Sequence, residues 1–231
     1  MEPWFDRAFG PGYESFYSHR DESDASRDVS RILAAGVDPH ELTLDLCCGQ
    51  GRHIEALARD GGFTRLVGLD RSSHLLQGAR QRLGRGASLV RGDMRQLPFP
   101  TGTYHLVLNL FTSFGYFEDD ADHRLSLQEV WRVLTVGGRL HLDHIDRRHL
   151  EEHLVASSRV ELDGRLLRCT RRLTENRVEK RLEAEDGTHV HLERVRLWYP
   201  EELQALLESC GFSEVRISLD GGRMHAWTAR A

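Results

Sequence analysis

The 231-residue sequence has no excess of basic residues. It contains 31 Lys and Arg against 36 Asp and Glu, which gives a formal net charge of −5 at pH 7 and a sequence pI of about 6.2. Surfaces that bind duplex nucleic acid neutralise phosphates with Lys and Arg. Nucleic acid is therefore an unexpected main partner, although the net charge leaves room for a local basic patch.

Long apolar runs and paired cysteines are also missing. Residues 1–6 lack the basic-then-apolar pattern of a signal peptide, and no apolar run reaches membrane-spanning length. The four cysteines form no CxxC pair, which favours reduced, buried thiols over disulfides or zinc. His149–His153 matches the HxxEH metalloprotease pattern, but no third ligand is evident, so we expect no metal. These absences predict a cytoplasmic protein without a membrane partner.

What the chain does contain is an alternation of strand-like and helix-like segments. The helix-like segments carry apolar residues every three or four positions, and the strand-like segments are short apolar runs. This alternation predicts an α/β fold in which helices cover both faces of a parallel sheet. Strands are expected at residues 42–46, 63–69, 87–91, 104–110 and 139–143, with a helix ending near 137–138 before the last of them.

The pattern changes near residue 157. Residues 157–198 show no convincing helix and contain two Asp-Gly pairs, which are hairpin signals, so we expect an antiparallel β insertion there. A helix beginning at Pro200 and two last strands should follow. The expected organisation is an N-terminal aromatic arm and helix covering the cofactor (1–36), a cofactor-binding core (37–156), the insertion (157–198) and a C-terminal helix with two strands (199–231).

The most informative stretch is residues 42–52. A short buried strand carrying Asp45 runs into a turn that contains Gly49 and Gly51, and a helix follows. Glycine tolerates a positive φ and lets a ligand lie against the backbone. The helix that follows presents unpaired N–H groups and the positive end of its dipole. This pattern predicts a site for a nucleotide-like cofactor.

Three acidic residues stand at successive strand ends. In a doubly wound sheet, ligands bind beyond the carboxyl ends of the strands. Asp70 lies at the spacing expected of an acid that accepts hydrogen bonds from both ribose hydroxyls. Asp93 is suited to accept from an adenine amino group, with Met94 packing on the ring. Asp45 can take the cofactor ammonium directly or through water.

Together these motifs resemble the class I S-adenosylmethionine-dependent methyltransferases, over almost the whole chain. The matching segments are Asp45-Leu-Cys-Cys-Gly-Gln-Gly-Arg52, Gly68-Leu-Asp70, Gly92-Asp93-Met94-Arg-Gln-Leu-Pro98, and Gly137-Gly138 before a strand. The resemblance implies a Rossmann-like, doubly wound sheet of seven mostly parallel strands, with an antiparallel last strand. It also implies that S-adenosyl-L-methionine is the cofactor and binds across Asp45, Gly49, Gly51, Asp70, Asp93 and Met94, to which we add Cys47, Arg71 and Asn109.

Residues 109–117 follow the fourth strand and should line the acceptor pocket. Phe111 can offer an aromatic face to a cation, with packing in the core as the alternative. Ser113 and Tyr116 carry hydroxyls that can orient an acceptor, and Tyr116 is also a catalytic candidate. At the end of strand five, His144 could act as a base, with a strand-end histidine without a role as the alternative. These two segments resemble glycine and amino-sugar N-methyltransferases.

The N-terminal arm contributes two further candidates. The resemblance implies that this segment folds over the cofactor. Arg20 could then pair with the methionine carboxylate, because a guanidinium matches a planar carboxylate. Tyr17, together with Tyr13, could close the lid, and we assign Tyr17 to the acceptor side. An exposed arginine on an arm is the competing interpretation of Arg20.

The function expected from these features is enzymatic transfer of a methyl group from S-adenosylmethionine to nitrogen or oxygen of a small molecule. Methylation of RNA or protein and non-catalytic binding of S-adenosylmethionine are the alternatives. A nicotinamide oxidoreductase is disfavoured, since Ile54 stands where a dinucleotide fold needs a third glycine. A homodimer is compatible with the sequence.

Overall fold

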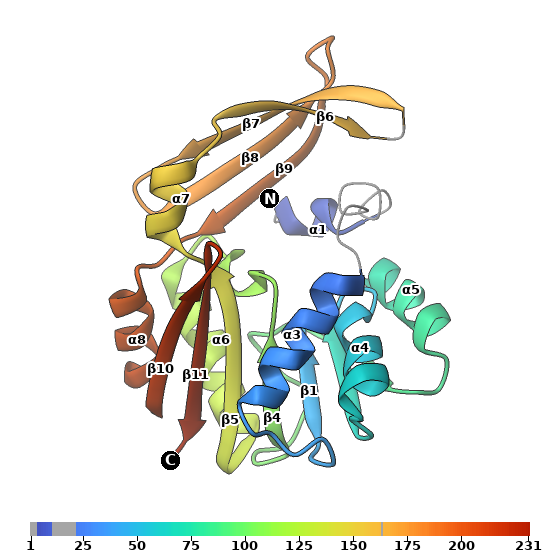
Figure 1. Ribbon diagram of the computed structural model, residues 1–231, viewed down its shortest axis with the longest axis vertical. Helices are drawn as coiled ribbons and strands as arrows, with labels where there is room; N and C mark the ends of the chain where they lie inside the picture. The colour runs from blue at the N-terminus through green and yellow to red at the C-terminus, as the bar shows by residue number, and fades with distance from the viewer. Residues whose placement is uncertain (1–3, 11–21, 163) are drawn as a thin grey trace.

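The computed structural model describes residues 4–10, 22–162 and 164–231, and Figure 1 shows two layers of β-structure along its long axis. The lower part is a seven-stranded sheet covered by helices. A four-stranded sheet lies above it, beyond the carboxyl ends of the parallel strands (Figure 1). Within the described ranges, no helix is long and apolar enough to cross a membrane.

The seven-stranded sheet has the order β10-β11-β5-β4-β1-β2-β3. Parallel pairs join β1 to β2 and β4, β2 to β3, and β4 to β5, whereas β11 is antiparallel to both β5 and β10. This arrangement confirms the predicted doubly wound, mostly parallel sheet with an antiparallel last strand. The strands are β1 (Thr43–Leu46), β2 (Leu66–Asp70), β3 (Ser88–Arg91), β4 (Tyr104–Asn109), β5 (Leu134–Ile145), β10 (Phe212–Asp220) and β11 (Arg223–Arg230).

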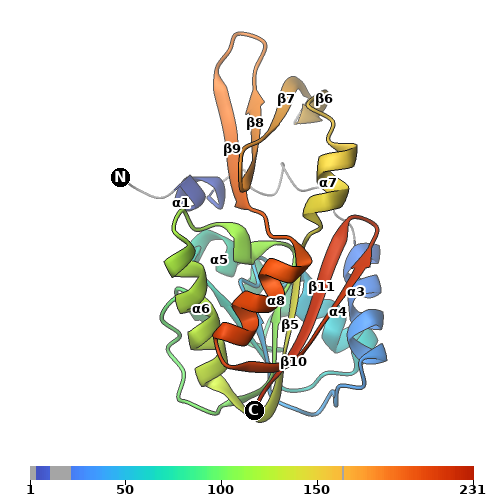
Figure 2. The same ribbon diagram turned by 90° about the vertical axis from the view of Figure 1, so that its left-hand side faces the viewer.

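Helices cover both faces of this sheet, as Figure 2 shows nearly edge on. On one side lie α3 (Glu22–Ala34) and α4 (Arg52–Gly61), with α5 (Ser73–Leu83) beside α4. On the other lie α6 (Asp120–Val133) and α8 (Pro200–Ser209). Because helices cover both faces, the central strand β1 is buried at all four positions, including the polar Thr43 and Asp45.

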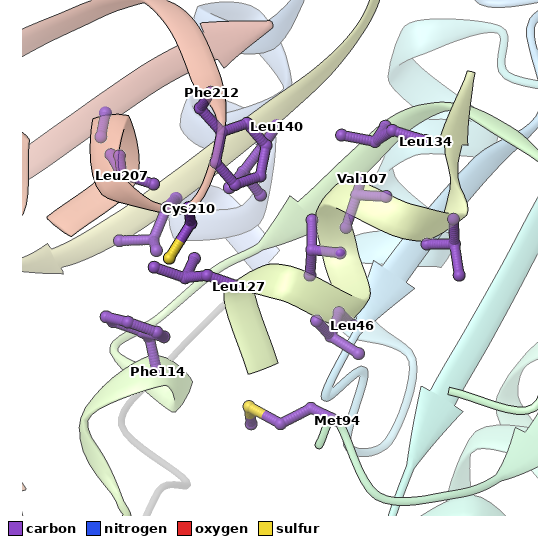
Figure 3. Close-up of a cluster of buried hydrophobic side chains, with 14 of the residues drawn as sticks. Leu46, Met94, Val107, Phe114, Leu127, Leu134, Leu140, Leu207, Cys210 and Phe212 are labelled. Carbon is purple, nitrogen blue, oxygen red and sulfur yellow. The ribbon is translucent and has the colours of Figure 1, made fainter. Parts of the chain in front are cut away.

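A large apolar cluster fills the side of α6 and α8 (Figure 3). It joins Leu46 of β1 to Leu127 of α6 and Leu207 of α8, and it extends to Met94 in the loop after β3. A second cluster, including Ile32 of α3 and Leu57 of α4, fills the other side. The two clusters hold the strand ends in place from both faces, so the loops that follow the strands start from a fixed frame.

One expected element boundary was wrong, and one short helix was not expected. Gly137 and Gly138 do not end a helix, since α6 ends at Val133 and both glycines lie inside β5. Leu134 already pairs with Tyr104, and a register shift before Leu106 accommodates the extra residues. A short helix that the sequence analysis missed, α7 (Arg147–His153), begins after β5, where the Asp146 side chain caps it by accepting from the Arg148 N–H.

The upper sheet, which we call the roof, consists of β6 (Ser157–Leu162), β7 (Arg165–Leu173), β8 (Arg177–Glu183) and β9 (His189–Arg196). All its pairs are antiparallel, as expected for the insertion after strand five. β9 returns to the core, where it contacts both the short helix α1 (Trp4–Ala8) and the 3₁₀ turn η1 (Ser113–Gly115). In Figures 1 and 2, α1 lies between the roof and the core.

Gly115 of η1 lies directly against the roof. A Cβ on Gly115 would lie 2.5 Å from Cγ1 of Val195 and 2.9 Å from the carbonyl oxygen of Arg196. Gly115→Ala should therefore lower the free energy of unfolding by about 1–3 kcal/mol, as overpacking does, in a denaturant titration. Gly78→Ala is the control, because its added Cβ would contact only the movable side chain of Gln50. Equal stability of the two variants would contradict this close packing.

Candidate active site

A cavity of about 440 Å³ opens at the carboxyl ends of β1, β2 and β4. Its walls come from the loops after these strands, from α4 and α5, and from the N-terminal Phe5 and Phe9. Most of the residues selected from the sequence line it. These are Asp45, Cys47, Gly49, Asp70, Arg71, Asp93, Met94, Phe111, Ser113 and Tyr116.

The loop between β1 and α4 bends sharply around the cavity. Cys47, Gly49 and Gly51 all have left-handed backbone, with φ of 66°, 54° and 76°. A Cβ on Gly49 would meet nothing within 4 Å, so the loop is open to the cavity at this position. A Cβ on Gly51 would lie 2.7 Å from Cδ1 of Leu83. Gly51 therefore serves to pack the start of α4 against α5, and Gly49 lets a ligand approach the backbone.

Asp70 connects this loop to the end of β2. Its carboxylate accepts hydrogen bonds from the backbone N–H groups of Gly49 and Ser72, both at 2.8 Å. Burial raises the pKa of Asp70, and these backbone hydrogen bonds oppose the rise. The carboxylate thus fixes the glycine loop and also lines the cavity, where it can accept further hydrogen bonds.

Asp45 carries a buried carboxylate at the cavity wall. The residue is 1% exposed, and within the described part of the chain its Oδ2 atom has no hydrogen-bond partner. Desolvation raises its pKa to about 6, although the charge of His53 opposes this. Binding of a cationic ligand stabilises the ionised form of a buried carboxylate whose oxygen lacks a hydrogen-bond partner.

Asp93 is held by two arginines. It accepts from Nη2 of Arg95 at 2.7 Å and from Nη1 of Arg71 at 2.6 Å. Burial alone would raise its pKa, but the hydrogen bonds from Arg95 outweigh that effect and hold the pKa at about 2. Contact with an adenine amino group remains a prediction for this carboxylate. Met94 beside it is buried and lines the cavity.

Part of the cavity wall is aromatic, and it includes Phe9, Phe111 and Tyr116. The Tyr116 ring lies 5.3 Å from that of Trp4 and 5.1 Å from that of Phe9, measured between centroids. The sequence analysis missed Phe5 and Phe9 as lining residues, although their i, i+4 spacing in an aromatic segment is a signal that could have identified them. It also missed Gln50, Arg52, His53, Arg82 and Phe117.

Some sequence-selected residues do not join the described cavity lining. Asn109 is buried and donates from Nδ2 to the Leu46 carbonyl at 3.3 Å, on the side of the α6 cluster. His144 is fully buried with its ring 5.2 Å from that of Trp198, and burial lowers its pKa to about 4. Neither side chain lines the described cavity, so cofactor contact by Asn109 and a base role for His144 stay predictions. Arg20 and Tyr17 lie outside the described residues.

Comparison with known proteins shows what the chain is similar to. Residues 43–138 match the family model of a methyltransferase domain. A dTDP-3-amino-3,4,6-trideoxy-alpha-D-glucopyranose N,N-dimethyltransferase of Streptomyces venezuelae is 33% identical over 129 residues, 54% of this chain and 52% of that protein. A demethylmenaquinone methyltransferase of Deinococcus radiodurans is 32% identical over 130 residues, 48% of this chain and 52% of that protein. The chain thus spans about half the length of these curated relatives.

Solved structures match over nearly the whole chain. An amino pentose methyltransferase from Micromonospora echinaspora, solved with bound S-adenosylmethionine, has a TM-score of 0.71 and 25% identity, with 94% of this chain and 96% of that one covered. DesVI of Streptomyces venezuelae has a TM-score of 0.73 and 23% identity, with 95% and 97% covered. The resemblance to class I S-adenosylmethionine-dependent methyltransferases that the sequence predicts is confirmed.

Proposed function

We propose that this chain transfers the methyl group of S-adenosylmethionine to the nitrogen of a small-molecule amine. The observation that carries the proposal is the cavity itself, which is lined by an open glycine loop, by aromatic side chains and by the buried Asp45, whose Oδ2 has no hydrogen-bond partner among the described residues. Two relatives named above act on amino sugars according to their names, which favours nitrogen over oxygen as the acceptor atom. A cytoplasmic location and a homodimer stay predictions.

The cofactor end of the cavity fits S-adenosylmethionine. Asp45 offers a carboxylate for the cofactor ammonium, and ionisation of this carboxylate would be favoured by the ligand's positive charge. Asp70 offers lone pairs to the ribose hydroxyls while it holds the Gly49 amide. Open space at Gly49 allows the cofactor to lie against the backbone. The bound cofactor supplies an activated methyl group, and the chain supplies its position.

The acceptor end fits a small molecule with a flat or apolar face. Phe111, Tyr116 and Phe9 line it, and ring faces attract a cation such as a protonated amine. Ser113 is buried with its Oγ donating to the Leu110 carbonyl at 3.1 Å, so its hydroxyl is fixed and can still accept one hydrogen bond. We assign the orientation of the acceptor to Ser113 and Tyr116.

The protein's contribution to the reaction is then mainly positioning. Holding two reactants in line can lower a barrier by roughly 7–11 kcal/mol. His144 does not line the cavity, so we do not assign it the role of a general base. The acceptor amine must instead give its proton to solvent before its nitrogen can accept the methyl group. The helix α1 contacts β9 and lies between the roof and the core, so we expect these two elements to limit the access of water to the acceptor.

The proposal predicts methylated product from amines and not from matched alcohols. Purified protein should be incubated with S-adenosylmethionine and pairs such as a 3-amino sugar nucleotide and its 3-hydroxy counterpart. S-adenosylhomocysteine and a product heavier by one methyl group should appear with the amine only, and the rate should rise with pH up to the pKa of the amine. Mass spectrometry measures both products.

Other outcomes of this screen would contradict the proposal in distinct ways. Methylation of the alcohol alone would overturn nitrogen as the acceptor atom. Tight cofactor binding without turnover across a broad amine panel would favour a non-catalytic binding protein. Turnover on RNA or protein that declines steeply with salt would favour a macromolecular acceptor.

A further inference from the structure

The turn that enters the acceptor end has an unusual backbone. Phe111 and Thr112 follow β4 and both have left-handed backbone, with φ of 64° and 68°. Residues with a Cβ rarely adopt this conformation, and two in succession need support from the surrounding structure. The side chains of Phe111 and of Ser113, on either side of Thr112, line the cavity. The shape of the acceptor end therefore depends on what holds this turn.

Two side chains from the main sheet hold it. Asp143 of β5 accepts from the Phe111 N–H through Oδ2 at 3.0 Å, and its own carbonyl accepts from the Thr112 N–H at 3.0 Å. Arg223 of β11 donates from Nη1 to Oγ1 of Thr112 at 2.8 Å. Both left-handed residues are thus bound by groups outside the turn.

Asp143 and Arg223 also bind each other in a forked geometry. Nε and Nη2 of Arg223 donate to Oδ1 and Oδ2 of Asp143 at 2.9 and 2.5 Å. Asp143 is 3% exposed, and although burial opposes its ionisation, Arg223 and His225 lower its pKa. The guanidinium also lies 5.3 Å from the Phe111 ring centroid. A bidentate pair of this kind fixes orientation as well as charge.

We propose that the Asp143–Arg223 pair positions the methyl acceptor by fixing the Phe111–Thr112 turn. This inference rests on the proposed function, since it assigns the Phe111 and Ser113 side of the cavity to the acceptor. Neither residue of the pair lines the cavity, so both act through the turn as positioning residues. The sheet strands β5 and β11 are antiparallel neighbours, with Asp143 opposite His225, and they give the pair a rigid base.

The test compares Arg223→Ala with a rescue variant and a control. In Arg223→Ala, amide hydrogen exchange of the segment 110–116 should accelerate at least about 10-fold, whereas that of β1 and β2 should not. The turnover number for the amine found in the screen should fall about 10- to 100-fold, as for a misplaced reactant. The dissociation constant of S-adenosylmethionine, measured by calorimetry, should stay within threefold. Arg168→Ala, which removes an exposed arginine of the roof, should change none of these.

Thr112→Gly provides the rescue. Glycine adopts a left-handed backbone without a Cβ penalty, so the turn should need the pair less. In the double variant Arg223→Ala, Thr112→Gly, the logarithm of the turnover number should recover by at least half of the decrease that Arg223→Ala causes. Normal exchange in Arg223→Ala, absence of rescue, or a loss of cofactor affinity equal to the loss of turnover would each overturn the proposal. If the wild-type protein binds no S-adenosylmethionine, the proposed function fails, while the exchange data still decide whether the pair holds the turn.

Discussion

Asp70→Ala is expected to weaken S-adenosylmethionine binding by at least about 100-fold. The carboxylate accepts from the Gly49 and Ser72 N–H groups, and it is assigned to the ribose hydroxyls of the cofactor. A hydrogen bond to a charged group contributes roughly 1.5–3 kcal/mol, so the loss of two ribose contacts alone corresponds to at least about 100-fold in affinity. The variant also releases the glycine loop, which adds to the loss.

Calorimetric titration measures this effect directly. Wild-type protein should bind S-adenosylmethionine and not NAD, and Asp70→Ala should bind S-adenosylmethionine at least about 100-fold more weakly. Asp186→Ala is the matched control, because Asp186 is an exposed aspartate in the β8–β9 turn that also accepts a backbone N–H, from Thr188. Unchanged affinity in Asp70→Ala would remove Asp70 from the cofactor site. Binding of NAD by the wild-type protein would favour the alternative that the glycine loop binds a dinucleotide.

The cofactor half of the site could be predicted from the sequence because its geometry is local. Asp45, Gly49 and Gly51 lie within seven residues, and a strand, a turn and a helix fix their relation to one another. Asp70 ends the next parallel strand, and parallel pairing places Asp45 opposite Gly68. The carboxyl ends of adjacent parallel strands meet at one edge, so the sequence order alone brings these acids together.

The acceptor half of the site was harder to predict. It depends on the face of the sheet to which each side chain at the end of a strand points, and the sequence does not determine that face. Asp143 and His144 are adjacent in β5, so they point to opposite faces of the sheet. The sequence analysis selected His144 for its chemistry, but His144 packs against Trp198 and Asp143 holds the acceptor turn. Arg223, 80 residues further along the chain, has no local signal that connects it to Asp143.

Asp45→Asn is expected to change stability and cofactor affinity in opposite directions. In the folded protein without ligand, the pKa of Asp45 is about 6 against a usual 3.8, because the carboxylate is buried. This difference corresponds to about 2–3 kcal/mol that disfavours the ionised folded state at neutral pH. An amide carries no charge, so Asp45→Asn should raise the midpoint of thermal unfolding by roughly 5–10 °C at pH 8. The same variant should bind S-adenosylmethionine at least about 10-fold more weakly, since the ammonium loses its charged partner.

The pH dependence of the stability and of the cofactor affinity gives the sharper test. A raised folded-state pKa means that the wild-type protein has the full stability of protonated Asp45 below pH 4, and loses it as the pH rises through about 6. The stabilisation by Asp45→Asn should therefore be present at pH 8 and absent at pH 4, whereas Asp186→Asn in the exposed turn should show no such difference. Cofactor binding requires ionised Asp45, so wild-type affinity should fall as the pH drops below 6, and affinity of the variant should not. Destabilisation of the variant at pH 8 would show that the ionised Asp45 side chain does not destabilise the ligand-free protein. A wild-type affinity that is constant from pH 5 to 8 would show that the charge of Asp45 does not bind the cofactor ammonium.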